Sequence, residues 1–136
     1  MKNTYLVDTN ILVRLLSKDD DQQFQTLIQL MLQGEIRYFI PSITLIETFW
    51  VLKSTYSLPK DQIVRGLFLL IESDEVELEE PVLMRNVLHQ FNQKNVDLAD
   101  AYIAEKAKQF PLPVLTWNHK DFKKLECEYY APGDLV

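Results

Sequence analysis

Four acidic residues stand beside apolar segments rather than in the charged stretches of the chain: Asp8, Glu47, Asp97 and Asp100. Carboxylates that converge near strand ends repel one another and lose hydration. A hard divalent cation relieves that repulsion, because Mg²⁺ takes oxygen ligands, keeps several waters and bridges carboxylates to a substrate phosphate. The residue types therefore predict a cation site that also receives a phosphate group.

Each of these acids also has a purely structural explanation. Asp8 can accept hydrogen bonds from the first amides of a following helix. Glu47 comes three residues after Thr44, the spacing of a capping box. Asp97 is a good N-cap, and Asp100 would then lie in the first helical turn, where the helix dipole favours negative charge. For each residue taken singly, both explanations stay open.

The neighbours of these acids favour the cation site. Glu47 lies on a largely apolar helix, and Asp97 and Asp100 share one helical face because they are three residues apart. Ala99 and Ala101 flank Asp100 with little side chain, so a ligand or another backbone can approach its carboxylate closely.

The elements that must position these acids alternate between strands and helices. Short apolar stretches predict strands near residues 5–7, 38–40, 76–78, 114–116 and 128–130, and helical spacing predicts helices near 11–16, 24–33, 45–53, 60–72, 81–91 and 98–110. Thr9 or Asn10 is expected to cap the first helix, and Gly34 to end the second. This alternation indicates a parallel sheet covered by helices on both faces, where ligands bind at the carboxyl ends of the strands. Asp8 and Asn118 fall at two such ends.

Composition predicts a single globular domain spanning residues 1–136. Apolar residues make up 47% and charged residues 25% of the chain, which excludes a disordered protein. There is no apolar run of membrane-spanning length and no secretory leader pattern, and Cys127 is the only cysteine. We therefore expect a protein of the reducing cytoplasm with no membrane association.

The net charge of −6 excludes a simple nucleic-acid coat protein, which would be basic. It does not exclude a nuclease, because bound cations reverse the local sign of a carboxylate cluster. Local positive charge is available in two predicted basic patches, although ordinary solvated side chains explain the same residues: one holds His119, Lys120, Lys123 and Lys124, and the other holds Arg14 and Lys18.

Four segments in this order resemble those of a known family. They are LVDTNILVRLL at residues 6–16, PSITLIETFWVL at 41–52, DLADAYIAEKA at 97–107 and VLTWNHKDF at 114–122. They resemble the PIN-domain metal-dependent ribonucleases, in particular the toxin of VapBC-type toxin–antitoxin pairs. The resemblance implies an α/β fold: a PIN-like three-layer sandwich whose central, mostly parallel sheet of four to five short strands has helices on both faces.

The resemblance assigns catalytic and metal-holding roles to Asp8, Glu47 and Asp100. Asp97 matches an additional acid and is either a ligand or the cap described above. Asn118 stands where many members carry an acid, and an amide orients a water or substrate oxygen without adding negative charge, which favours one metal over two. Support for the substrate is expected from Thr9, Thr116 and Lys120.

The expected activity is Mg²⁺-dependent hydrolysis of single-stranded or loop RNA, with Mn²⁺ as a second usable metal. A small antitoxin protein is the expected partner. The apolar helices bearing Phe49, Trp50, Phe68 and Leu69-Leu70 can supply a homodimer interface, although core packing is the commoner use of such residues. The alternative is a PIN-like RNA- or protein-binding module with weak or no nuclease activity. A phospho-acceptor receiver domain is disfavoured, because the first strand ends on Asp8 alone rather than on an acidic pair.

Overall fold

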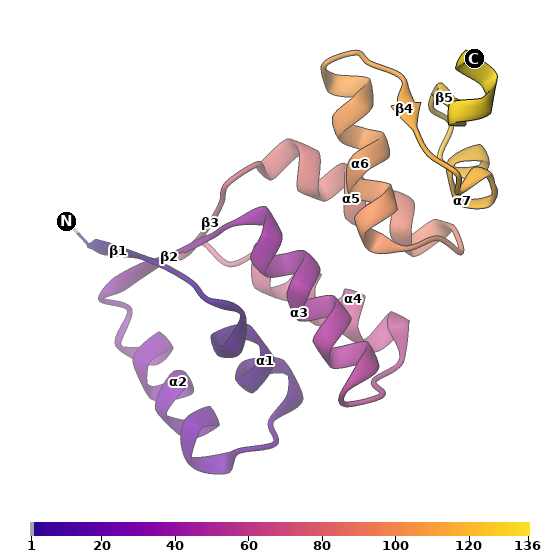
Figure 1. Ribbon diagram of the computed structural model, residues 1–136. Helices are drawn as coiled ribbons and strands as arrows, with labels where there is room; N and C mark the ends of the chain where they lie inside the picture. The colour runs from indigo at the N-terminus through magenta and orange to yellow at the C-terminus, as the bar shows by residue number, and fades with distance from the viewer. Residues whose placement is uncertain (1) are drawn as a thin grey trace. The chain divides into compact units, whose positions relative to one another are not determined.

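The structure is a computed structural model that describes residues 2–136, and its chain divides into two units (Figure 1). The N-terminal unit ends at Pro81, and the C-terminal unit is Val82–Val136. Each unit has its own sheet and its own helices, and we describe each by itself. The single domain that the composition indicates therefore stays a prediction.

The N-terminal unit is built on three parallel strands in the order β1-β2-β3. Tyr5 of β1 pairs with Tyr38 of β2, and Ile40 of β2 pairs with Leu78 of β3. The elements in chain order are β1 (Asn3–Leu6), α1 (Thr9–Ser17), α2 (Asp21–Gln33), β2 (Ile36–Ile40), α3 (Ser42–Ser54), α4 (Lys60–Ile71) and β3 (Val76–Leu78).

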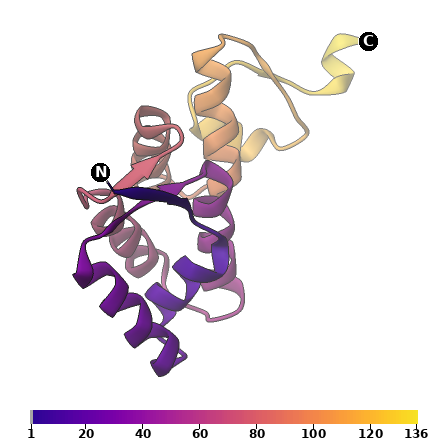
Figure 2. The same cartoon turned by 90° about the vertical axis from the view of Figure 1, so that its left-hand side faces the viewer.

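Helices α1 and α2 lie on the same side of these strands in both views (Figures 1 and 2). Side chains alternate between the faces of a strand, so Tyr38 and Ile40 of β2 project to one face. Both line a small cavity together with Leu12 of α1, Leu27 of α2 and Leu70 of α4. The apolar stripes of three helices thus meet one face of the sheet, which holds the start of α1 beside the end of β1.

The C-terminal unit packs helices around a short two-stranded parallel sheet. Its elements are α5 (Pro81–Gln93), α6 (Leu98–Gln109), β4 (Val114–Leu115), α7 (His119–Lys124), β5 (Tyr129–Tyr130) and a 3₁₀ helix (Pro132–Leu135). Val114 pairs with Tyr129 across this sheet. Met84, Val87, Leu88 and Phe91 of α5 recur at helical spacing and are almost fully buried, so they form the core of this unit.

The predicted α/β class is confirmed, with parallel strands and, in residues 2–136, seven α-helices. All five expected strands are present. They pair as a three-stranded and a two-stranded sheet, one in each unit, where the sequence predicted one central sheet. Gly34 ends α2 with a φ of +66°, as glycine at a helix C-terminus commonly does. Of the helices described, none has both the length and the apolar character that crossing a membrane requires.

Candidate active site

Asp8 lies at the exit of β1 and is the N-cap of α1. Its backbone is extended, and its Oδ1 accepts a hydrogen bond of 2.7 Å from the amide of Thr9. The prediction that Thr9 or Asn10 caps this helix is therefore wrong by one or two residues, because the helix already begins at Thr9. The cap fixes the direction of an exposed carboxylate whose second oxygen remains a potential cation ligand.

Glu47 is tied to Asp8 through the neighbouring threonine. The hydroxyl of Thr9 donates to Oε1 of Glu47 at 3.3 Å, so the carboxylate of α3 reaches the first residue of α1. The two acids of the N-terminal unit thus adjoin the same threonine. This arrangement agrees with the predicted joint role of Asp8 and Glu47, although their role in holding a metal stays a prediction.

The capping box expected between Thr44 and Glu47 does not form. The helix already begins at Ser42, two residues before Thr44, and its N-cap Pro41 makes no side-chain cap bond. The hydroxyl of Thr44 instead donates to the carbonyl of Val7 at 3.0 Å, and both residues are buried. This bond ties the start of α3 to the end of β1, next to Asp8.

We expect the substitution Thr44→Val to lower the free energy of unfolding by about 1–2 kcal/mol, because it keeps the side-chain shape but leaves the Val7 carbonyl without its donor. Urea unfolding followed by circular dichroism measures the effect. Thr55→Val is the matched control, since Thr55 is exposed at the end of α3. Equal denaturation midpoints for the two variants would contradict the role given to this bond.

In the C-terminal unit, Asp97 is the N-cap of α6, as one of its two explanations predicted. Its Oδ1 accepts from the amide of Ala99 at 3.0 Å. Asp100 lies in the first turn of the same helix and is only partly buried. The prediction that Asp97 is an additional metal ligand is left untested by this contact, because the cap engages only one of its carboxylate oxygens.

The environment of the Asp100 carboxyl group disfavours its charged form. Burial, a hydrogen bond with Asp121, and the negative charges of Asp97 and Asp121 together raise the pKa of Asp100 to about 6. The amide of Asn118 acts in the opposite direction, because its Nδ2 donates to Oδ2 of Asp100 at 2.8 Å. A carboxylate held beside other carboxylates is the environment that a bound cation would relieve.

Asn118 uses both ends of its amide. While Nδ2 donates to Asp100, Oδ1 accepts from the amide of Asp121 at 3.2 Å and so caps α7. Its own backbone amide donates to the hydroxyl of Thr116 at 2.9 Å. Thr116 and Asn118, both expected near the site, therefore hold the turn that presents Asn118 to Asp100.

Asp121 is a member of this cluster that the sequence analysis missed. It interacts with Asp100 and accepts from the backbone amide of Asp97 through Oδ2 at 3.2 Å. The available signal was the three-residue spacing from Asn118, which is the spacing of an N-cap bond. Three lysines and a histidine surround Asp121 in residues 119–124, so the sequence there indicates a basic patch rather than a helix start.

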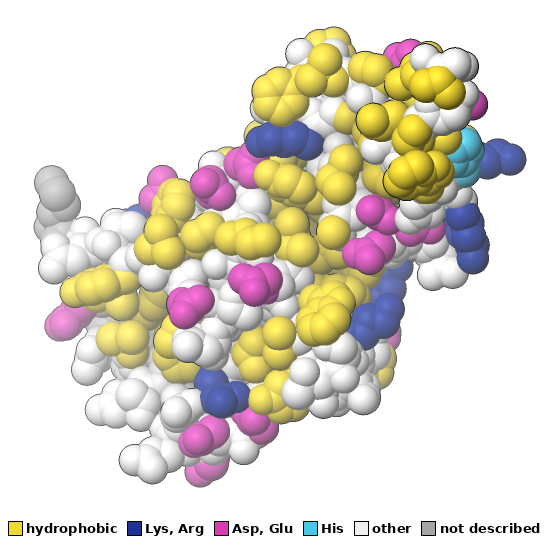
Figure 3. Space-filling view, in the orientation of Figure 1, with side chains coloured by type: hydrophobic (Ala, Val, Ile, Leu, Met, Phe, Trp, Pro, Cys, Tyr) yellow, Lys and Arg dark blue, Asp and Glu magenta, His cyan; other side chains and the backbone are white. Residues whose placement is uncertain are grey.

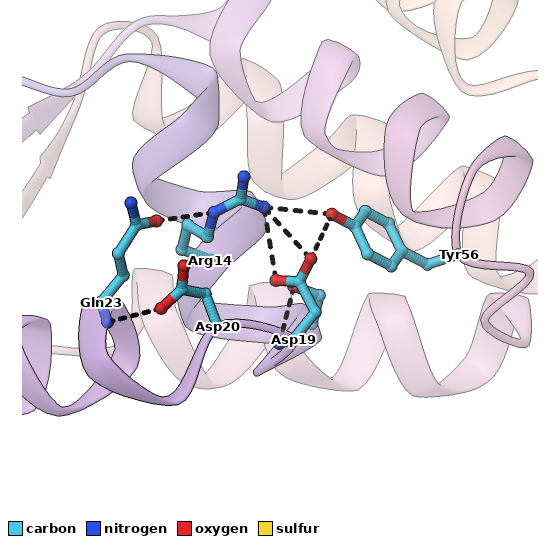
Figure 4. Close-up of polar contacts among 6 residues, drawn as sticks. Arg14, Asp19, Asp20, Gln23 and Tyr56 are labelled. Carbon is cyan, nitrogen blue, oxygen red and sulfur yellow. Dashed lines mark hydrogen bonds and ion pairs between the residues drawn. The ribbon is translucent and has the colours of Figure 1, made fainter.

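The two predicted basic patches differ in the structure. Lys120 and Lys123 are exposed, so the patch on α7 presents positive charge. Arg14 is instead engaged: its guanidinium donates to Gln23 at 2.7 Å, to Asp19 at 3.3 Å and to the hydroxyl of Tyr56 at 3.0 Å (Figure 4). The predicted patch at Arg14 and Lys18 is wrong, because the charge of Arg14 is paired within the N-terminal unit.

The donors in the two units suit a hard cation. Asp8 and Glu47 belong to the N-terminal unit, whereas Asp97, Asp100, Asn118 and Asp121 belong to the C-terminal unit. All of them offer oxygen atoms, the ligand type that Mg²⁺ and Mn²⁺ prefer. Within residues 2–136, however, no group of three or more His, Cys, Asp or Glu side chains is arranged to hold a metal ion. A shared metal site therefore stays a prediction.

Comparison with known proteins identifies the family. The sequence profile of the PIN domain matches residues 5–126, and a search of curated protein sequences finds no match. Two solved structures are similar at 20% sequence identity. The first is VapBC2 from Rickettsia felis bound to a DNA fragment from their promoter; the match covers 94% of this chain and 98% of that chain, with a TM-score of 0.40. The second is FitAB bound to an IR36 DNA fragment; the match covers 93% of this chain and 94% of that chain, with a TM-score of 0.35. The family match alone spans most of the chain and includes every predicted site residue, and the chain belongs to the PIN domain family.

Proposed function

We propose that this protein is a metal-dependent ribonuclease that hydrolyses phosphodiester bonds in single-stranded or loop RNA. The observation that carries the proposal is the hydrogen-bonded group of Asp100, Asn118 and Asp121 in a chain that belongs to the PIN domain family, whose members are typically nucleases. The N-terminal unit supports it with a second pair of acids, Asp8 and Glu47, that adjoin one threonine.

Asp8, Glu47 and Asp100 are the residues that would hold Mg²⁺ or Mn²⁺. When bound, the metal would supply charge neutralisation at the phosphate and acidify a water molecule. The hydroxyl of Thr9 would keep Glu47 in its present rotamer, and the amide of Asn118 would do the same for Asp100. These two contacts orient the carboxylates before substrate arrives, which reduces the reorganisation needed during the reaction.

Residues around the carboxylates would bind the RNA and help the reaction proceed. Lys120 is exposed on α7 and would contact a phosphate oxygen beside the scissile bond. The departing ribose oxygen takes a proton from solvent. Asp97 and Asp121 would support the metal-holding acids, because Asp97 caps α6 and Asp121 accepts from the backbone amide of Asp97.

Four matching segments resembling VapBC-type toxins support a more specific assignment. We propose that the protein is the toxin of a toxin–antitoxin pair in the cytoplasm, neutralised by a small antitoxin protein. A homodimer is proposed as well, because Trp50 of α3 and Leu69 of α4 remain exposed while Phe49 is buried. A short neighbouring gene for a DNA-binding antitoxin would support the toxin assignment.

We expect the purified protein to cleave single-stranded RNA with Mg²⁺ or Mn²⁺ and to lose that activity completely in EDTA. A contaminating metal-independent ribonuclease would survive EDTA. Added Mg²⁺ should restore the cleavage activity that EDTA removes. Calorimetric titration of Mg²⁺ in the absence of RNA gives a readout independent of activity. Metal binding without cleavage of any RNA would favour the binding module over the nuclease.

A further inference from the structure

Trp117 is an exposed aromatic side chain inside the candidate site's own turn. It lies between Thr116 and Asn118, and 81% of its surface is accessible to solvent. The protein has only one other tryptophan, Trp50. A single exposed apolar side chain is ordinary on a protein surface, so the surroundings of this indole decide whether it binds a ligand.

Backbone hydrogen bonds support the segment around Trp117. The amide of Thr116 donates to the carbonyl of Tyr130 at 2.9 Å, which extends the β4–β5 ladder by one residue. The amide of His119 then donates to the carbonyl of Trp117 at 3.0 Å, where α7 begins. The backbone is therefore hydrogen-bonded on both sides of the Trp117 Cα atom.

The residues from β4 to Asn118 differ in their exposure to solvent. Val114 is buried and Thr116 is half-buried, whereas Leu115 is 62% exposed. Trp117 lies in the bend that follows β4 and is exposed, as is Leu115 two residues before it. Two exposed apolar side chains therefore precede Asn118 along the chain.

Positive charge accompanies these apolar side chains. The sequence of α7 is HKDFKK, in which three lysines outnumber one aspartate. Lys120 and Lys123 are exposed, and the ring of His119 makes an edge-to-face contact with Tyr129 at 5.3 Å between centroids. Figure 3 shows hydrophobic, histidine and basic side chains together on this side of the C-terminal unit.

An aromatic side chain beside lysines is the combination that binds single-stranded nucleic acid, because the ring stacks on a base while the cations contact phosphates. We propose that Trp117 is a base-stacking residue that holds the nucleotide next to the phosphate bound at Asn118 and Asp100. Consecutive Cα atoms are about 3.8 Å apart, so this base and that phosphate would belong to neighbouring positions on one strand. The inference rests on the proposed function, since it names how that site would hold RNA.

A protein partner fits this surface less well. The centre of a protein–protein interface is depleted of lysine, whereas here Lys120 and Lys123 follow the indole within six residues. A cation flanking an exposed ring is instead favourable for a polyanion. RNA is also the substrate class that the adjoining carboxylates require under the proposed function.

The first measurement is the binding of a fluorescein-labelled single-stranded RNA to the full chain carrying Asp8→Asn, which prevents cleavage. In this background, Trp117→Ala should weaken binding about 10- to 100-fold, and Trp117→Phe should retain most of the affinity because a phenyl ring still stacks. The matched control is Phe110→Ala, which removes another exposed aromatic ring with a lysine beside it and should leave the affinity unchanged. Equal affinities for the Trp117→Ala variant and its parent would overturn the proposal.

The second measurement asks whether the indole contacts a base. With Trp50→Phe, Trp117 is the only tryptophan, and its emission should be quenched by RNA. A series of strands, each with one abasic position, should contain one strand for which Trp117→Ala causes no further loss of affinity. If Trp117→Ala lowers the affinity for every abasic strand by the full factor, the indole does not stack on a base and the proposal is wrong.

These outcomes separate the stacking role from the nuclease assignment. If the unmodified protein cleaves RNA and Trp117→Ala binds normally, stacking is refuted and the proposed function stands. If the stacking results are obtained but the unmodified protein cleaves no RNA, the nuclease assignment is refuted and stacking stands. If RNA neither binds nor quenches Trp117, the stacking role is refuted and a protein becomes the better candidate for this surface.

Discussion

The substitution Asp8→Asn should reduce metal-dependent RNA cleavage by about 10³-fold while leaving the fold intact. Loss of a metal-holding charge removes about 4 kcal/mol of transition-state stabilisation under the proposed mechanism. The fold should survive because Asn is as good an N-cap as Asp, so its side-chain oxygen can still accept from the amide of Thr9. Cleavage assays and urea unfolding of the same preparation measure both properties.

Two further variants make this result interpretable. Asp8→Ala should lose activity and also about 1 kcal/mol of stability, because it removes both the charge and the cap. Asp61→Asn is the control for a lost surface carboxylate, since Asp61 pairs with Arg65 across an exposed turn of α4. Cleavage by the Asp8→Asn variant at the unmodified rate would refute the role of Asp8 in holding the metal.

The substitution Asp100→Asn should combine an equally large loss of cleavage with a gain in stability. Folding places the Asp100 carboxylate beside Asp97 and Asp121, and raises its pKa to about 6. A neutral amide removes the repulsion and still offers an oxygen to Nδ2 of Asn118. The gain should be about 1 kcal/mol in EDTA at pH 8, because a half-exposed carboxylate is partly screened by solvent.

The pH dependence of this gain has a definite sign. Because the pKa of Asp100 is higher in the folded than in the unfolded protein, the folded state binds more protons between the two pKa values. The unmodified protein should therefore lose stability relative to the Asp100→Asn variant as the pH rises from about 4 to about 6, with no difference below that range. Thermal unfolding of both proteins in EDTA across this range measures it. A variant less stable at pH 8 would contradict the repulsion.

Local chemistry explains which features the sequence could predict. Gly34 ends α2 and Asp97 caps α6 because both effects depend on residues within one helical turn. The α/β class also followed from local patterns, since apolar strands and helical spacing are each read within one segment. The four segments that resemble PIN ribonucleases led to the family that the profile match confirms.

The features that the sequence could not predict depend on distant partners or on short elements. The hydroxyl of Thr44 bonds a carbonyl 37 residues away, so its local spacing to Glu47 gave the wrong capping box. Helix α7 is only six residues long and mostly charged, which left no apolar periodicity to reveal it. Without that helix, Asp121 could not be placed beside Asp100. The pairing of strands into two sheets likewise depends on contacts that no local pattern encodes.

The two-ended amide of Asn118 limits which residues this position can accept. Capping α7 requires a short side chain with an acceptor, which Asp, Ser and Thr also provide. Holding an ionised Asp100 requires a donor at the same time, which Asp lacks, and Gln is longer by one methylene. Asn meets both demands with one rigid group. In a saturation library at position 118 that is selected for RNA cleavage, we therefore expect asparagine to be enriched above aspartate. Asn118 would then be a functional replacement for the acid rather than the loss of a function.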